Sequence, residues 1–370
     1  MPRMRRFEFV GGTSNKFWEI SQSGSEVTVH FGRIGTKGQT QTKDLGSWED
    51  AAERVRSLIK EKLREGYTEI TVGPSAELGR GYRPPPDLPP YEPPPLPEDG
   101  PLTIAGISLP TGHRLQGDPD MQMRGVQMVQ APVVWATDAV VRDAGRILAA
   151  LREPAATMKL VPVLLAGMSG DQGRPWDSHE FAPTDPRRID SLDAASELAH
   201  AWTSNRADPD EEQDDDQPLG GEFPGLATPP LAAPPGGFLR LFSKPSDPAD
   251  DSDVLSRVTD GRLALVASSR PADVITALGW IGAVNVHNDP ALLSAVLRSW
   301  EDRWVARVVE IGFDTLALTV GNPPTDDKTA LALAAEHFAF CPDNVWQGAG
   351  TLEAYAQSLV RNRRWDFWWD

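Results

Sequence analysis

Hydrophobic and polar residues alternate along the first part of the chain in a way that predicts β-strands. A period of two places apolar side chains on one face of a strand and polar side chains on the other. Stretches rich in Gly, Ser, Thr and Asn separate the alternating segments and predict turns. We therefore expect an antiparallel meander of four strands, at residues 6–10, 17–21, 27–31 and 39–43.

A helical pattern follows the predicted meander. Ser47 is a suitable N-cap, and apolar residues then recur three and four positions apart from Ala51 to Leu63. Gly66 follows as a residue that ends helices. One amphipathic helix on one face of an antiparallel sheet forms a complete small α+β domain, which we assign to residues 1–82.

Proline dominates the next segment, because ten of the nineteen residues from 83 to 101 are proline. Proline fixes φ and lacks a backbone N–H, so a run of this kind favours an extended polyproline II conformation. We interpret residues 83–101 as a proline-rich linker. A ligand for a proline-recognition domain is the weaker alternative.

Beyond the linker, the patterns predict a mixed α/β domain over residues 102–370. We expect helices at 138–152, 190–203, 271–278, 290–303, 326–338 and 352–360, and strands at 160–166, 263–266, 306–313 and 315–320. Seven acids in nine residues at 208–216, followed by a stretch rich in Pro, Gly and Ala, carry too little apolar surface to fold. This predicts a disordered acidic and proline-rich insertion at about 206–237.

Charge and cysteine content change this picture in two respects. The net charge of −17 is uneven, since twelve Lys and Arg stand against ten Asp and Glu up to Val72, which leaves −19 for the rest. The two ends therefore favour partners of opposite charge. With Cys341 as the single cysteine and no apolar segment of membrane-spanning length, we expect a cytoplasmic protein without an intrachain disulfide or a membrane partner.

The segment from His30 to Gln41 carries the strongest chemical signal. A predicted strand ends in an aromatic residue, a glycine and an arginine, and a glycine-rich turn with a lysine and an amide side chain follows. Cations, exposed turn N–H groups and an aromatic face together suit sugar-phosphate. The alternative is an ordinary hairpin with solvated charges. The candidate nucleic-acid-binding residues in this segment are Phe31, Gly32, Arg33, Lys37 and Gln39.

Residues 6–72 resemble the WGR domain of DNA-dependent poly(ADP-ribose) polymerases and many bacterial proteins. The match runs through Asn15-Lys16-Phe17-Trp18-Glu19-Ile20, the segment from Phe31 to Gln39, and the helix that ends in Lys60-Glu61-Lys62-Leu63-Arg64-Glu65-Gly66-Tyr67. The resemblance implies contact with nicked or broken DNA duplex, with Arg33 and Lys37 at phosphates, and it adds Lys16 to the candidate nucleic-acid-binding residues. Phe31 stands where the family has Trp, which implies altered end recognition, and we expect Trp18 in the core.

Residues 263–370 are similar to a bacterial domain of unknown function, DUF4253, whose name implies no activity. The resemblance rests on Leu278-Gly279-Trp280, Ser299-Trp300-Glu301-Asp302-Arg303, Ala334-Ala335-Glu336-His337-Phe338, Cys341-Pro342-Asp343-Asn344 and the C-terminal Arg364-Trp365-Asp366-Phe367-Trp368-Trp369-Asp370. Four aromatic residues in the last six favour a terminal strand docked in an apolar groove over an exposed patch.

A second cluster of chemical groups lies within this region. Glu336, His337, Cys341 and Asp343 are close in sequence and could act as a base with a thiol nucleophile or as metal ligands. Pro342 argues that one helix does not carry them all, and a structural role for His337 and Cys341 is the preferred interpretation.

The sequence thus predicts a DNA-binding protein whose WGR-like module contacts nicked or end-containing duplex. An acidic C-terminal domain of unknown activity follows, and we expect neither a cofactor nor a metal. One alternative is a toxin-neutralising or other interaction protein, in which the acidic domain binds a protein partner. A second alternative is an enzyme that processes nucleotides or nucleic acids.

Overall fold

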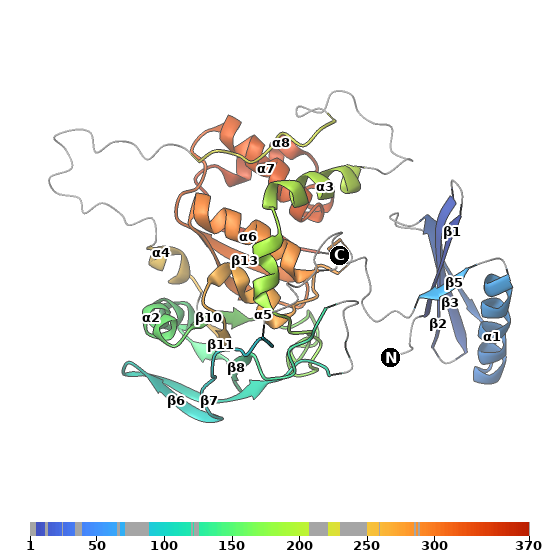
Figure 1. Ribbon diagram of the computed structural model, residues 1–370, viewed down its shortest axis with the longest axis horizontal. Coiled ribbons are helices and arrows are strands. Elements are labelled where there is room, and N and C mark those ends of the chain that lie inside the picture. Colours follow the sequence, from blue (N-terminus) through green and yellow to red (C-terminus); the bar gives the residue numbers. More distant parts are fainter. Residues whose placement is uncertain are drawn as a thin grey trace. The chain divides into compact units, whose positions relative to one another are not determined.

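The computed structural model describes residues 5–11, 14–23, 25–33, 39–64, 67–70, 89–119, 121, 126–206, 221–229, 250–258, 260–284, 286–287 and 289–369. Two compact units divide the chain, one built on residues 1–75 and one on the C-terminal part (Figure 1). Lys37 and residues 71–88 lie outside the described residues. Among the described residues, no helix combines the length and the apolar character needed to cross a membrane.

The N-terminal unit is a five-stranded antiparallel sheet with one helix. Its strands follow the order β4-β3-β2-β1-β5, where β1 is Arg5–Gly11, β2 Ser14–Ser23, β3 Glu26–Arg33, β4 Gln39–Asp44 and β5 Thr68–Ile70. Helix α1, Trp48–Arg64, lies along the sheet (Figure 1). The predicted meander and helix are confirmed. Strand β5 was not predicted, because three residues are too few to show a period.

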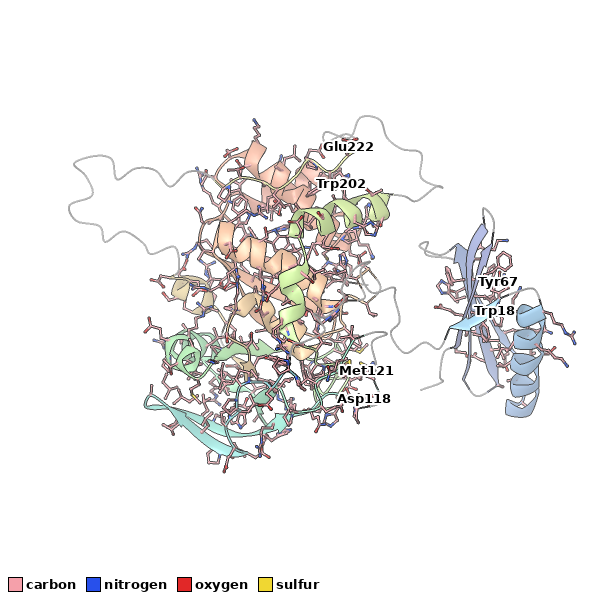
Figure 2. The ribbon with its side chains drawn as sticks, viewed as in Figure 1. Trp18, Tyr67, Asp118, Met121, Trp202 and Glu222 are labelled. Atoms are coloured by element: carbon pink, nitrogen blue, oxygen red, sulfur yellow. The ribbon has the colours of Figure 1, made fainter. Side chains whose placement is uncertain are left out.

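The core of this unit forms where α1 covers one face of the sheet. Alternate residues of β1 to β3 meet apolar residues of α1, and the buried set is Phe7, Trp18, Ile20, Val27, Ala51 and Ile59. Trp18 is 5% exposed, so its expected place in the core is confirmed (Figure 2). The ring centroids of Phe7 and Trp18 lie 5.4 Å apart in a tilted arrangement, which aromatic pairs prefer.

The C-terminal unit is built on a nine-stranded mixed sheet. Eight strands follow the order β14-β13-β12-β10-β11-β8-β7-β6, and β9 pairs with β11. Their bounds are β6 Gly100–Ile104, β7 Ile107–Leu115, β8 Val134–Thr137, β9 Val141–Arg142, β10 Leu160–Leu165, β11 Asp260–Ala267, β12 Ala306–Ile311, β13 Thr315–Val320 and β14 Arg364–Trp368. Strands β10 and β12 are parallel, whereas the other pairs are antiparallel.

Helices cover both faces of this sheet, so its central strands are apolar on both sides. Leu263 and Leu265 of β11 face one cluster with α2 (Ala144–Thr157) and α4 (Ser252–Leu255), whereas Ala264 and Val266 face the other cluster. The second cluster includes α3 (Ala194–Arg206), α5 (Val274–Leu278), α6 (Pro290–Trp304), α7 (Asp327–Phe340) and α8 (Leu352–Leu359). The short segments are η1 (Pro186–Ser191), η3 (Pro271–Asp273) and the π-helix η4 (Asn344–Ala349).

Two predicted helices begin later than expected. The helix predicted at 138–152 is α2, which starts at Ala144 because Val141 and Arg142 first pair with β11. The helix predicted at 190–203 is α3, which starts at Ala194 because η1 occupies the preceding residues. The other four predicted helices and all four predicted strands occur within a few residues of their expected bounds. Strands β6 to β9 were not predicted.

The second half of the proline-rich segment contacts the C-terminal unit. Residues 89–98 contain neither helix nor strand, and strand β6 begins at Gly100. The indole N–H of Trp135 donates to the Glu98 carbonyl at 3.1 Å, and Arg187 donates to the Pro89 carbonyl at 2.9 Å. Residues 83–88 lie outside the described part of the chain. A free spacer is therefore a prediction for those residues alone.

A short segment within the predicted disordered insertion packs against the C-terminal unit. Residues 207–220 and 230–249 are not described. Residues 221–229 pack against the core cluster that includes α3, α6 and α7. Ala227 is 4% exposed, and the Phe223 ring lies 6.1 Å from that of Trp202, which Figure 2 labels near Glu222. Apolar residues within the low-complexity stretch explain why this part is ordered.

The C-terminal aromatic run forms the edge strand β14, as predicted. Trp365 and Phe367 pair with Leu318 and Leu316 of β13. Both aromatic side chains and that of Trp369 are buried, whereas Trp368 is 37% exposed. The expected docking in the core is confirmed, with the alternation of a strand deciding which rings are buried.

Candidate nucleic-acid interface

Four of the six candidate residues of the N-terminal unit occupy two adjacent cross-strand rows of its sheet. Lys16 of β2 is the register partner of Arg33 of β3. Two residues further along, Phe31 pairs with Trp18 on one side and Gln39 on the other. Residues far apart in the sequence thus meet at one end of β2, β3 and β4. We call these positions, Lys16, Phe31, Arg33 and Gln39, the sheet rim.

The sheet rim contains both a partly buried residue and exposed residues. Phe31 is half-buried and packs against the core under α1, whereas Lys16 and Gln39 are exposed. Every residue of β4 is exposed, and this strand forms one edge of the sheet. An edge strand of hydroxyl and amide side chains offers donors and acceptors without apolar surface. The backbone of Arg33 ends β3, while Lys37 lies in the undescribed turn after it.

Gly32 lies on the opposite side of the sheet from Phe31. Its register partner is Phe17, which is buried and in edge contact with the His30 ring at 4.9 Å. The Nδ1 atom of His30 lies 2.7 Å from a carboxylate oxygen of Glu19. Because an ionised carboxylate only accepts hydrogen bonds, Nδ1–H is the donor. The central residue of the Phe31-Gly32-Arg33 tripeptide therefore packs on a different face from its aromatic neighbour.

The structure adds three residues to this end of the sheet that the sequence did not single out as a site. Phe9 is the register partner of Lys16, and its ring centroid lies 5.6 Å from that of Tyr67. The ammonium nitrogen of Lys62 lies 5.2 Å from the centroid of the same Tyr67 ring, which Figure 2 labels. A cation above a tyrosine ring is an attractive contact. Amphipathic periodicity gave no signal for this group, because Tyr67 follows the helix.

Glu336, from the C-terminal candidate cluster, is a fully buried carboxylate with four hydrogen bonds. It accepts from the indole N–H of Trp300 at 2.8 Å and from two Arg303 nitrogens at 2.9 and 2.5 Å. The backbone N–H of Ala227 is the fourth donor, at 2.7 Å. Arg303 also donates to the Ala227 carbonyl at 2.7 Å. This ion pair therefore joins α6 and α7 to the ordered segment 221–229.

His337 is fully buried within an aromatic cluster that includes Trp300. Its Nδ1 lies 3.0 Å from the hydroxyl of Tyr355, and the Trp365 and Trp300 rings lie 4.6 and 4.7 Å from the imidazole. No partner for Nε2 occurs among the residues that the structure describes. Burial, and secondarily the charge of Arg303, lowers the pKa of His337 well below its usual value. The imidazole is thus neutral at neutral pH.

Cys341 and Asp343 contact other groups than His337. The buried Cys341 thiol donates to the Trp368 carbonyl at 2.9 Å and to the Asn344 side-chain oxygen at 3.4 Å, and burial raises its pKa to about 12. Asp343 accepts from Gln347 at 3.0 Å. Within the described ranges, no three His, Cys, Asp or Glu side chains are grouped as metal ligands. The Asn344 side chain also donates to the Tyr355 hydroxyl at 3.0 Å, so His337 and Cys341 are joined indirectly through Tyr355 and Asn344, with no direct hydrogen bond between them.

These features define a two-part protein, in which a small α+β unit precedes an α/β domain with a helix-covered mixed sheet. Residues 1–74 match the sequence model of the WGR domain, and residues 262–370 match that of DUF4253, a domain of unknown function. The chain therefore combines a WGR domain with a DUF4253 domain. The WGR domain is a nucleic-acid-binding module in its family.

Two proteins of Escherichia coli (strain K12) are similar to this chain over a short stretch. Protein YehF is 39% identical over 66 residues, which are 18% of this chain and 24% of YehF. The uncharacterized protein YfeS is 35% identical over 65 residues, 18% of this chain and 27% of YfeS. The chain thus spans about a quarter of the length of these relatives. A crystal structure from Bacteroides fragilis is 41% identical, with 18% of this chain and 19% of that chain covered, at a TM-score of 0.18.

Proposed function

We propose that the WGR domain of this protein binds DNA at nicks or broken ends, and that the sheet rim contacts the sugar-phosphate backbone. The observation that supports this most is the pairing of Lys16 with Arg33 beside the pairing of Phe31 with Gln39. Two cationic positions and one aromatic position then lie in adjacent rows. Phosphates are bound by such cations, and an aromatic ring stacks on a sugar or base at an end.

The exposure of the rim supports the same proposal. The half-buried Phe31 is fixed by its packing against the core, which orients its ring at small cost in side-chain entropy. Lys16 is exposed, and no ion-pair partner of it occurs in the described part of the chain. A cation without a competing carboxylate is available for a phosphate. The Phe9 and Tyr67 rings extend the aromatic surface next to Lys16.

The small net charge of the WGR domain limits how many of its cations can contact DNA phosphates. Up to Val72 the balance is only +2, and cations on α1 alternate with acids. We therefore infer that phosphate contacts come from the few cations Lys16, Arg33 and Lys37 rather than from a general positive field. Three neutralised phosphates give a slope of log K against log salt of roughly −2.7.

A salt titration of the whole protein with nicked, blunt and single-stranded DNA tests the proposal. Arg33→Ala is expected to weaken binding to nicked duplex about tenfold, from a lost charge-assisted contact of roughly 1.4 kcal/mol, and to reduce the slope by about 0.9. Lys60→Ala removes an exposed cation of α1 and is the matched control. Fluorescence anisotropy measures both quantities.

Two outcomes would contradict the proposal. If Arg33→Ala leaves affinity and salt slope unchanged, the rim does not contact phosphate. If Lys60→Ala weakens binding as much as Arg33→Ala, the contact is a general electrostatic one and the rim has no special role. Preference for nicked over intact duplex is expected in the parent protein. A protein partner of the acidic C-terminal domain stays a prediction.

A further inference from the structure

A polar cavity in the C-terminal unit lies outside every candidate site described above. It has a volume of about 340 Å³ and is lined by His113, Leu115, Asp138, Asp177, His179 and Arg262. These residues come from β7, the turn after β8, the loop after β10, and β11. A cavity of this size accommodates a small ligand or part of a larger one. We call it the two-histidine pocket.

The pocket lies where segments from several strands of the sheet meet. Strands β8 and β10 are both antiparallel to β11, so β8 and β10 run in one direction. Asp138 directly follows β8, and Asp177 and His179 lie in the loop after β10. Residues that are distant in the sequence therefore line one cavity.

Both histidines are held with a defined tautomer. Nδ1 of His113 lies 2.6 Å from a carboxylate oxygen of Asp138, and Nδ1 of His179 lies 2.7 Å from the backbone carbonyl of Gln116. Because these oxygens only accept hydrogen bonds, each Nδ1 carries the proton and donates it. Nε2 is then the nitrogen that is left for a ligand on both rings. The backbone of His179 is left-handed, with φ of 61°, a conformation that marks many functional sites.

Arg262 supplies a fixed positive charge to the same pocket. Its Nε donates to the Thr137 carbonyl and its NH1 to a carboxylate oxygen of Asp177, each at 2.7 Å. Among the described residues, NH2 has no hydrogen-bond partner. The guanidinium is thus oriented by two contacts and keeps N–H groups for an anion. Its planar donor geometry matches the oxygens of a phosphate.

The loop that carries Asp177 and His179 is fixed on the sheet. The buried Trp176 donates from its indole N–H to the Ala166 carbonyl at 2.8 Å. Arg174 binds both carboxylate oxygens of Glu180 at 2.6 Å and lies 4.7 Å from the Phe313 ring centroid. Catalytic groups need this kind of support, because small displacements cost much of the rate.

We propose that the two-histidine pocket is an acid–base site that cleaves a phosphodiester with a neighbouring ribose hydroxyl. Its lining, as far as the structure describes it, includes no Ser, Thr or Cys, and in the proposed reaction the 2′-hydroxyl of the substrate is the nucleophile. Nε2 of His113 takes the proton of the 2′-hydroxyl, and Asp138 stabilises the imidazolium that forms. This inference goes beyond DNA binding and does not rest on it.

The reaction balances without a further reactant. The 2′-oxygen forms a bond to phosphorus as the bond from phosphorus to the 5′-oxygen breaks, and protonated His179 gives its Nε2 proton to that leaving oxygen. The products are a 2′,3′-cyclic phosphate and a 5′-hydroxyl. Arg262 neutralises charge on the non-bridging oxygens. Asp177 orients Arg262, so it is a positioning residue.

The test uses the full chain and a dinucleoside monophosphate that carries the 2′-hydroxyl, with its 2′-deoxy counterpart as the control substrate. We expect cleavage of the first and none of the second. His113→Ala and His179→Ala are each expected to lower kcat/KM at least ~100-fold. His200→Ala, an exposed histidine of α3, is the matched control and is expected to retain full activity.

Folding of the variants is checked by thermal melting, and His113→Asn serves if His113→Ala melts early. Absence of cleavage by the parent protein would overturn the inference. Equal activity of folded His113 variants, or an equal loss in His200→Ala, would overturn it as well.

Discussion

Replacing Glu336 by alanine should destabilise the C-terminal unit more than a typical substitution does. The fully buried carboxylate accepts from Trp300, from two nitrogens of Arg303 and from the Ala227 amide. Glu336→Ala leaves all four donors without this acceptor, and the guanidinium of Arg303 keeps its charge. Removing one partner of a buried ion pair costs roughly 3–5 kcal/mol. At about 2–4 °C per kcal/mol, the melting temperature should fall by roughly 10 °C.

Tryptophan fluorescence is a suitable probe for this melt, because ten of the twelve tryptophans lie at residue 135 or beyond. Glu353→Ala, an exposed carboxylate of α8, is the matched control and should change the free energy of unfolding by less than about 0.5 kcal/mol. Limited proteolysis should also cut near residue 227 faster in Glu336→Ala. A melting temperature within about 2 °C of the parent protein would refute the reasoning that this ion pair anchors segment 221–229.

Two further predictions concern buried titratable groups. Burial lowers the pKa of His287 to about 4, whereas the same group in the unfolded chain has its usual pKa of 6.5. Acid therefore protonates the unfolded state first, so the free energy of unfolding is highest above pH 6.5 and falls by up to ~3 kcal/mol as the pH decreases to 4. His287→Gln keeps a donor for the Phe340 carbonyl without titrating, and chemical denaturation across this range should show a flatter pH dependence; the same slope as in the parent would contradict this. Since the pKa of the buried Cys341 thiol is about 12, iodoacetamide at pH 8 should label the unfolded but not the native protein, as mass spectrometry would show, and rapid native labelling would count against it.

The N-terminal domain could be predicted from the sequence because its contacts are local. Each of the first three strands pairs with the next one along the chain, so alternation and turn residues specify nearly the whole sheet. The exception is β5, which pairs with β1 across the length of the domain. The chemistry of the segment from His30 to Gln41 identified Phe31, Arg33 and Gln39, the resemblance to WGR domains added Lys16, and the register then placed Lys16 opposite Arg33.

The C-terminal sheet was harder to predict because its partners are distant in sequence. Strand β8 has only four residues, all buried, and pairs with β11 more than a hundred residues later. A short apolar run without alternation does not distinguish a buried strand from other buried segments. The helices were easier, because Pro290 and Pro271 mark helix starts that local chemistry dictates.

Residues that are close in the sequence do not necessarily form a reactive site together. Glu336 and His337 are neighbours on α7 and both contact Trp300, but successive helix residues point in directions about 100° apart, and their hydrogen bonds go to different groups, Arg303 for Glu336 and Tyr355 for His337. Burial then keeps His337 unprotonated and the Cys341 thiol protonated, which makes both poor acid–base groups at neutral pH. His113 and His179 are separated by many residues, but the sheet brings both to one solvent-accessible cavity with Nε2 available. A histidine can act on a ligand only if the ligand can reach its ring and if the free nitrogen points towards the ligand. The fold determines both conditions, and the sequence alone does not show them.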